Sequence, residues 1–277
     1  MVVFGDRELI SITGAGGKTS LALALCSRLS RTKRVLLTTT TRMGVNEIPR
    51  GMDLLVGNFQ DVLSALRKFR EKSFCKAIAR GIEGDKLVGF SGAEVDSFYE
   101  SDLAGYMVVE ADGAKGFPVK GYAEFEPVIP GLSTCQIVVV GAEIFTEPLS
   151  EKTVFRFPLF LAAAGFTEGS RPGPESISSI LENPMIFLKD SLENKGMKRV
   201  LFINKMDLIS SKEQKDAVKE TLLRLRQYDM ACTGALGWGG HGSPDSCCWK
   251  ISANGNEQAA FAVWEGDSPF HCCQLRG

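Results

Sequence analysis

The chain has 277 residues, a length that allows one or two domains with a sizeable hydrophobic core. Apolar residues make up 44% and charged residues 23%, which excludes a disordered chain, a collagen-like fibre and a coiled coil. The formal net charge of −1 gives no reason to expect a polyanionic partner, so nucleic acid is not favoured.

Neither the N-terminus nor the apolar runs indicate membrane insertion. The first residues lack the basic patch and long apolar core of a signal peptide. The longest apolar runs, 137–140 and 159–164, fall well short of the ~20 residues that a membrane helix needs. We therefore expect no membrane association and a cytoplasmic location, where cysteines stay as thiols.

Strand and helix patterns alternate over the first 230 residues. Short apolar or β-branched segments predict strands at Glu8–Thr13, Arg34–Thr40, Gly105–Glu110, Cys135–Gly141 and Lys198–Asn204. Apolar residues at helical spacing predict helices over Thr19–Ser30, 60–72 and Ser211–Tyr228. Residues 142–197 give no clear pattern. The alternation predicts an α/β fold, with a mainly parallel sheet flanked by helices.

A glycine-rich loop joins the first predicted strand to the first predicted helix. Glycines allow the backbone N–H groups of a loop to converge on an anion, and the following helix adds the positive end of its dipole. We therefore expect nucleotide phosphates to bind at Gly14, Ala15, Gly16, Gly17, Lys18, Thr19 and Ser20. Lys18 would reach the β- and γ-phosphates, and the Thr19 hydroxyl would ligate Mg²⁺. This loop places the fold in the phosphate-loop nucleotide-binding type.

The loop departs from the full phosphate-loop pattern, which has glycine where Ile12 stands. A dinucleotide-binding loop is the competing interpretation. It lacks its third glycine, because Thr19 occupies that position, and no acidic residue follows about 20 residues later. A glycine-rich turn that merely caps the helix is the remaining alternative.

Two carboxylates follow the predicted strand that ends at Glu110. Asp112 is expected to hold Mg²⁺ together with Thr19, and Glu110 to position the attacking nucleophile. Lys115 would neutralise charge on the transferred phosphoryl group. A solvated turn after a core strand is the alternative. Thr38–Thr41 end a second strand at the same predicted edge, where their hydroxyls would serve Mg²⁺ or substrate, or simply suit a strand.

The segment Asn204-Lys205-Met206-Asp207 follows the last apolar strand. In GTP-binding proteins an Asn-Lys-x-Asp segment at that place recognises guanine. The Asp accepts hydrogen bonds from the ring N1–H and the exocyclic amine, and the Lys stem packs on the base. The sequence therefore favours guanine recognition by Asn204, Lys205 and Asp207. An ordinary loop with Asp207 as a helix cap is the alternative.

Together these motifs resemble one family, the selenium-dependent hydroxylase accessory proteins (YqeC-like). The segments that carry the resemblance are Ile12–Ser20, Leu37–Met43, Val109–Gly116, Glu126–Pro130 and Asn204–Asp207. It implies a phosphate-loop fold and a role in maturing molybdenum hydroxylases that carry labile selenium. The residues that it carries over are Gly14, Gly16, Gly17, Lys18, Thr19, Glu110, Asp112 and Lys115. Arg42 departs from the family, which often has His in that segment.

Composition changes abruptly near residue 230. Both His, all three Trp and five of the eight Cys lie beyond it. We therefore expect a phosphate-loop nucleotide-binding domain over 1–229 and a distinct, poorly ordered tail over 230–277. The Cys and His of the tail lack the spacing of a zinc site. An altered reading frame near residue 230 would also explain the change.

The first expectation for function is Mg²⁺-dependent binding and hydrolysis of GTP or ATP that assists maturation of a molybdenum hydroxylase. The second is an ATP-dependent kinase or ligase acting on a small acid. The third is a non-catalytic regulator that nucleotide switches. The oligomeric state stays open.

Overall fold

The computed structural model describes residues 4–189, 194, 196–236, 247–249 and 262–263. Among these residues, ten strands form one sheet in the order β15-β14-β13-β12-β10-β1-β8-β2-β5-β4. The strands are β1 Glu8–Gly14, β2 Arg34–Thr39, β4 Asp53–Val56, β5 Phe74–Ala79, β8 Tyr106–Glu110, β10 Cys135–Gly141, β12 Lys198–Asn204, β13 Met230–Thr233, β14 Cys247–Trp249 and β15 Ala262–Val263. Every pairing from β4 to β13 is parallel, and β14 and β15 pair antiparallel.

Two small sheets stand beside the large one. The strands β9 Val119–Lys120 and β11 Val154–Phe155 pair in parallel. The strands β3 Arg42–Gly44, β6 Gly81–Glu83 and β7 Lys86–Val88 form an antiparallel sheet. Both small sheets contribute residues to the lining of the cleft described below.

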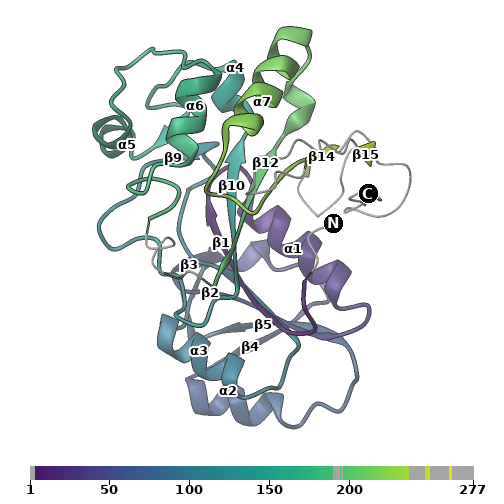
Figure 1. Cartoon of the computed structure of the whole chain (residues 1–277). Helices are drawn as coiled ribbons and strands as arrows, with labels where there is room; N and C mark the ends of the chain where they lie inside the picture. Colours follow the sequence, from purple (N-terminus) through teal and green to yellow (C-terminus); the bar gives the residue numbers. More distant parts are fainter. Residues whose placement is uncertain (1–3, 190–193, 195, 237–246, 250–261, 264–277) are drawn as a thin grey trace.

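Helices cover both faces of the sheet (Figure 1). Helix α1 (Lys18–Leu29) packs on one face, while α2 (Phe59–Leu66) and α3 (Gly92–Glu100) pack on the other beside β2 and β8. Helices α5 (Phe157–Ala164), α6 (Pro174–Leu181) and α7 (Lys212–Arg224) cover β10 and β12 on that second face. The short α4 (Glu143–Thr146) and the 3₁₀ turns η1 (Val45–Glu47) and η2 (Met206–Leu208) complete the order.

The alternation of side chains along the strands produces these layers. In β10, Ile137 and Val139 belong to the core under α1, whereas Val138 and Val140 belong to the core under α5–α7. Because both faces are covered, the central strands β1, β8 and β10 are buried along their whole length and most of their residues are apolar, as is usual in parallel sheets.

The direction of the chain across the sheet reverses at β1. The chain reaches β2 and β8 on one side of β1, and then continues through β10 and β12 on the other side. Ligands of open α/β sheets bind outside the carboxyl ends of the strands at such a reversal. The fold therefore places the glycine-rich loop, which directly follows β1, at the position where a ligand is expected.

The sequence located the central elements well, so the expected α/β fold with a mainly parallel sheet is confirmed. The strands expected at 135–141 and 198–204 have those bounds. The helix expected over 60–72 is too long, because α2 ends at Leu66 and Phe69 turns back to contact Phe74. Helix α7 ends at Arg224, since Leu225 and Tyr228 turn into the core.

The strand β13 begins where the composition changes. It pairs in parallel with β12, so the sheet continues past residue 229. The division at residues 229 and 230 stays a prediction. Most of the tail, with the metal site and the poor order considered for it, lies outside the described residues. No described helix combines the length and the apolar character that a membrane crossing requires.

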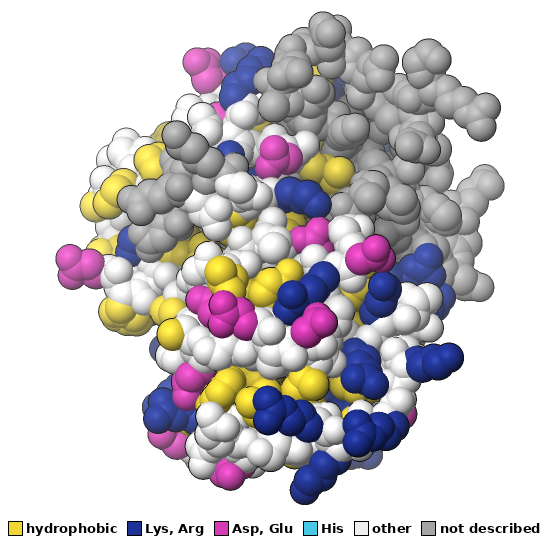
Figure 2. All heavy atoms as spheres, turned by 60° about the horizontal axis from the view of Figure 1, so that its bottom comes forward, with side chains coloured by type: hydrophobic (Ala, Val, Ile, Leu, Met, Phe, Trp, Pro, Cys, Tyr) yellow, Lys and Arg dark blue, Asp and Glu magenta, His cyan; other side chains and the backbone are white. Residues whose placement is uncertain are grey.

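Charge is unevenly spread over the surface. On the face that carries α2 and α3, Lys and Arg side chains gather on the right-hand side (Figure 2). The net charge of −1 is therefore an average that hides a locally basic surface.

The aromatic cluster under α3 allows a test of the core. Phe98 is buried, and its ring centroid lies 4.6 Å from that of Phe59 and 4.9 Å from that of Phe90. We expect Phe98→Ala to lower the free energy of unfolding by about 3–5 kcal/mol, because it leaves a cavity. Urea denaturation measures this loss. Phe125→Ala is the matched control, since Phe125 is 70% exposed, and an equal loss in both variants would contradict the packing.

Candidate functional site

The backbone of the glycine-rich loop has a shape that only glycine accommodates at three positions. Gly14, Gly16 and Gly17 have φ values of 95°, 87° and 122°. A Cβ at Gly14 would lie 2.1 Å from the Val139 carbonyl oxygen, and one at Gly17 would lie 2.3 Å from Asn204 Nδ2. The loop is therefore pressed against β10 and against the end of β12, and side chains are excluded there.

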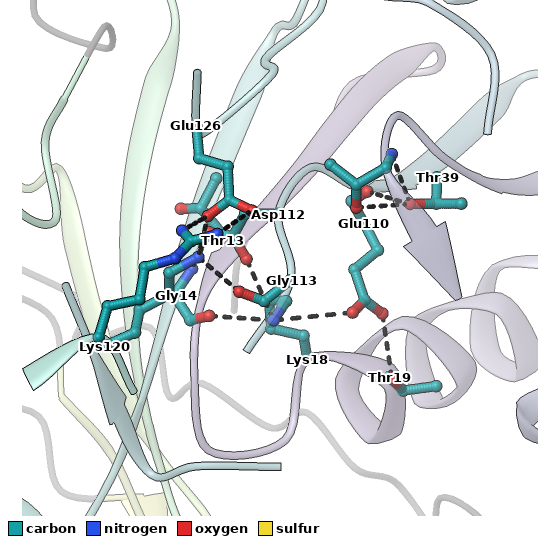
Figure 3. A network of polar contacts seen from close by, with 12 residues as sticks. Thr13, Gly14, Lys18, Thr19, Thr39, Glu110, Asp112, Gly113, Lys120 and Glu126 are labelled. Carbon is teal, nitrogen blue, oxygen red and sulfur yellow. Dashed lines mark hydrogen bonds and ion pairs between the residues drawn. The ribbon is translucent and has the colours of Figure 1, made fainter. Parts of the chain in front are cut away.

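Lys18, the first residue of α1, lies at the centre of a buried polar network (Figure 3). Its Nζ lies 3.1 Å from Asp112 Oδ1 and 3.6 Å from Glu110 Oε1, and it donates to the Gly14 carbonyl at 3.0 Å. Burial lowers the pKa of Lys18, but the charges of Asp112 and Glu110 outweigh burial and raise the pKa above its ordinary value. Lys18 therefore stays charged at neutral pH.

The two carboxylates differ in their contacts. Asp112 is fully buried, and its Oδ2 accepts a hydrogen bond from the Gly14 N–H at 2.8 Å. Glu110 Oε2 instead accepts from the Thr19 hydroxyl at 3.0 Å. Glu47, at the end of η1, is the second acceptor near that hydroxyl, at 3.4 Å. The structure thus places Glu110 beside Thr19, while Asp112 holds Lys18 and the glycine loop.

Burial raises the pKa of Glu110, and the opposing charge of Lys18 does not cancel the rise. A carboxyl with a raised pKa next to a charged lysine is a feature of functional sites, although buried ion pairs also produce it.

A second ion-pair network continues from Asp112. Lys120, on β9, is fully buried and lies with its Nζ 3.5 Å from Asp112 Oδ2 and 2.8 Å from Glu126 Oε2. Glu126 also pairs with Arg156, which precedes α5. Burial lowers the pKa of Lys120 despite these carboxylates. The sequence singled out none of the cations in this network, because neither Lys120 nor Arg156 stands in a motif.

A large cleft of about 1540 Å³ opens over these networks. Residues from several parts of the chain line it: Gly16–Ser20, Thr41, Arg42, Gly44, Glu47, Lys86, Glu110, Gly113–Phe117, Phe125, Glu126, Phe155, Arg156, Asn204, Lys205, Asp207, Ala235 and Leu236. Apart from Gly14, Ala15, Thr38–Thr40 and Asp112, each predicted site residue therefore lines one cleft.

The Asn204–Asp207 segment reaches the same cleft. The Asn204 side chain is buried, donates to the Gly16 carbonyl at 2.8 Å and accepts from the Leu236 N–H at 2.8 Å. Lys205 pairs with Glu143 at 2.5 Å, and Asp207 is exposed. The Asn204 amide therefore joins the glycine loop to the chain that follows β13, whereas the Asp207 carboxylate is accessible from solvent.

The other expected residues have simpler surroundings. The hydroxyls of Thr38, Thr39 and Thr40 donate to the carbonyl oxygens of Ile78, Glu110 and Val128. Those three hydroxyls hold neighbouring chain segments together, and only Thr41 of the run lines the cleft. Lys115 is exposed at the rim of the cleft with a positive φ of 49°.

Fold and site together define an α/β protein with a glycine loop and a buried lysine–carboxylate network at the reversal of a parallel sheet. A family model described as YqeC protein matches residues 10–158. The chain is also 30% identical over 223 residues to "Uncharacterized protein YqeC" of Escherichia coli (strain K12), covering 80% of this chain and 84% of that protein. This chain belongs to the YqeC family. The region matched by the family model includes both ion-pair networks and ends before Asn204.

The Glu126 contacts lead to a pH-dependent stability. Burial raises the pKa of Glu126, but hydrogen bonds from Arg156 and Lys120 outweigh burial and lower the pKa below its ordinary value. The stabilisation is therefore present above the pKa of the unfolded chain and is lost as pH falls through the folded pKa. We expect Glu126→Gln to destabilise the protein at pH 7, and the difference from wild type to shrink below about pH 4.5.

Urea denaturation at several pH values measures this difference. The matched control is Glu124→Gln, because Glu124 is exposed two residues away. A constant difference across the pH range would show that the network does not depend on the Glu126 charge.

Proposed function

We propose that the protein binds a nucleoside triphosphate with Mg²⁺ and hydrolyses it, in a phosphate-loop type of site. The observation that carries the proposal is the buried Lys18 ammonium, held by two carboxylates at the start of α1 and directly after β1. Even a paired charge loses hydration when it is buried, and the pairing does not always repay that cost, so the place of Lys18 at a glycine loop points to a functional reason.

Phosphate chemistry suits this place. The N–H groups of Gly14, Ala15 and Gly16 already donate within the protein. The N–H groups at the start of α1, together with the positive end of its dipole, are therefore the ones that favour an anion. Lys18 would exchange part of its contact with Asp112 and Glu110 for contact with the phosphates. Before a nucleotide binds, the two carboxylates reduce the free-energy cost of burying the Lys18 ammonium.

The side chains present fit a Mg²⁺ ion, which prefers oxygen ligands and is usually held by one or two carboxylates together with substrate phosphates. Among the described residues no group of three or more His, Cys, Asp and Glu is arranged to hold a metal ion. A Mg²⁺ ion here would therefore take most of its ligands from phosphates and water. We propose Thr19 and Glu110 as the ligands, because their oxygens lie 3.0 Å apart. Asp112 then acts by orienting Lys18. When bound, Mg²⁺ would neutralise charge on the phosphates.

Residues of this chain would supply the remaining chemistry. Glu47, 3.4 Å from the Thr19 hydroxyl, and Glu110 are the carboxylates available to orient an attacking water. Lys115, on the rim, would approach the transferred phosphoryl group. At the other end of the cleft, Asp207 would accept hydrogen bonds from guanine, with Lys205 beside the base, which favours GTP over ATP.

Membership in the YqeC family supports a wider role, since the family resemblance implies assistance to selenium-dependent molybdenum hydroxylases. We propose that hydrolysis drives a step in that maturation, with the hydroxylase or its cofactor machinery as partner. Hydrolysis that needs no second substrate would support this role over a kinase or ligase. Binding without any turnover would instead favour a nucleotide-switched regulator.

Calorimetric titration with GTP and ATP in the presence of Mg²⁺ tests the proposal. We expect wild type to bind GTP and Lys18→Ala to bind it at least about 30-fold more weakly, because losing one side of a buried charge pair costs about 2–5 kcal/mol. Lys33→Ala is the matched control, since Lys33 forms an ion pair with Asp6 on the surface.

Lys18→Ala leaves two buried carboxylates without their lysine, so circular dichroism must show that it folds. Thr19→Ala is the second variant, and we expect it to weaken the dependence on Mg²⁺ without unfolding the protein. Failure of wild type to bind either nucleotide would refute the proposal.

The base assignment has a test of its own. We expect Asp207→Asn to weaken GTP binding about tenfold or more while ATP binding stays unchanged, because hydrogen bonds to a charged group contribute ~1.5–3 kcal/mol. Asp216→Asn, at an exposed position on α7, is the control. Equal GTP and ATP affinities in wild type would remove the guanine assignment and leave the phosphate site standing.

A further inference from the structure

The cleft is larger than one ligand requires. Its volume of about 1540 Å³ exceeds the ~300–1,000 Å³ of typical small-molecule pockets. The glycine loop, Asn204, Lys205 and Asp207 account for only part of its lining. The remainder comes in part from β3, η1, β7 and the segment after β13, and in part from the chain after β8 and the start of α5, next to β9 and β11.

Within that remainder lies an aromatic shelf with two cations, defined here as Lys115, Phe117, Phe125, Phe155 and Arg156. The ring centroids of Phe117 and Phe155 lie 5.7 Å apart. Lys115 Nζ lies 5.5 Å from the Phe155 centroid, and Arg156 Cζ lies 4.9 Å from it. Arg156 Cζ also lies 5.3 Å from the Phe125 centroid. The shelf is therefore one connected group of side chains.

The shelf borders the glycine loop. The Gly16 N–H donates to the Phe117 carbonyl at 2.8 Å, so the backbone that carries this ring is bonded to the loop. Lys120, which pairs with Asp112, also donates to the Gly113 carbonyl at 2.6 Å and to Glu126. A ligand on the shelf would therefore lie close to the phosphate end of the proposed nucleotide site.

Charge and exposure indicate what the shelf would take. The cations Lys18, Lys120 and Arg156 are matched by the carboxylates of Glu110, Asp112 and Glu126. In the part of the chain that the structure describes, no carboxylate lies within ion-pair distance of Lys115, so its charge is available to a ligand. Phe125 is 70% exposed and Arg156 Cζ lies 5.3 Å from its ring centroid, so much of the ring is open to a ligand.

We infer that the shelf binds a second ligand, a planar aromatic molecule that carries a phosphate or carboxylate group. The ring system would stack on Phe125 and Phe155, and the anionic group would contact Lys115. Aromatic faces select flat rings, and the adjacent cations select against neutral ones. The inference rests on the proposed function in one respect: it assumes that the nucleotide, and not the second ligand, occupies the glycine-loop end of the cleft.

Isothermal titration with 1-naphthyl phosphate tests the inference on the full-length protein. Two comparison probes each lack one feature: 1-naphthol has no anion and cyclohexyl phosphate has no aromatic ring. We expect naphthyl phosphate to bind at least about tenfold more tightly than either. Cyclohexyl phosphate loses stacking, which contributes roughly that much, and 1-naphthol loses the charged contact with Lys115, which contributes a similar amount.

Variants locate the probe. We expect Phe125→Ala and Lys115→Ala each to weaken its binding about tenfold. Phe69→Ala is the matched control, because Phe69 forms a similar cluster with Lys76 and Phe74 outside the cleft, and it should bind as wild type does. Phe125 is exposed, so its replacement leaves the fold intact.

Lys18→Ala separates this inference from the proposed function. Binding of naphthyl phosphate that survives Lys18→Ala supports a separate shelf site. Loss of the probe in Lys18→Ala with no effect of Phe125→Ala would place it in the glycine loop and overturn the inference. Absence of probe binding by wild type would overturn it as well, whether or not GTP binds.

Discussion

The site depends on the compensation of one buried charge. The Lys18 ammonium is enclosed at the start of α1, where only Asp112 and Glu110 provide opposite charge within 4 Å among the described residues. Those carboxylates stand at the end of β8, which pairs directly with β1. The pairing of β1 with β8 therefore brings Lys18 close to Asp112 and Glu110, so the site forms only when these two strands pair.

The compensation extends outward in steps. Asp112 forms ion pairs with both Lys18 and Lys120. Lys120 also pairs with Glu126, and Glu126 pairs with the partly exposed Arg156. Each charge in the interior thus has a partner, as low-dielectric surroundings demand. Because the last pair lies beside the shelf, a ligand there and a nucleotide at the loop would be in contact with the same chain of charges.

The sequence predicted the centre of the fold because its strands are short apolar runs that are buried on both faces, as Cys135–Gly141 illustrates. The sequence led to the expectation that Thr19 and Asp112 hold Mg²⁺ together, whereas in the structure the Thr19 hydroxyl donates to Glu110 and Asp112 contacts Lys18. It missed Lys120 and Arg156, because single cations far from a motif gain their meaning only from tertiary contacts. It missed α3 too, although Ser91 and Glu94 form a recognisable capping box before it.

One side chain has a mechanical consequence. The Asn204 amide donates from its nitrogen to the Gly16 carbonyl and accepts with its oxygen from the Leu236 N–H. One side chain therefore links the loop after β1 to the segment after β13. A Cβ at Gly17 would strike the same amide. We therefore expect a displacement of the glycine loop to reach the segment that follows β13 through this one amide.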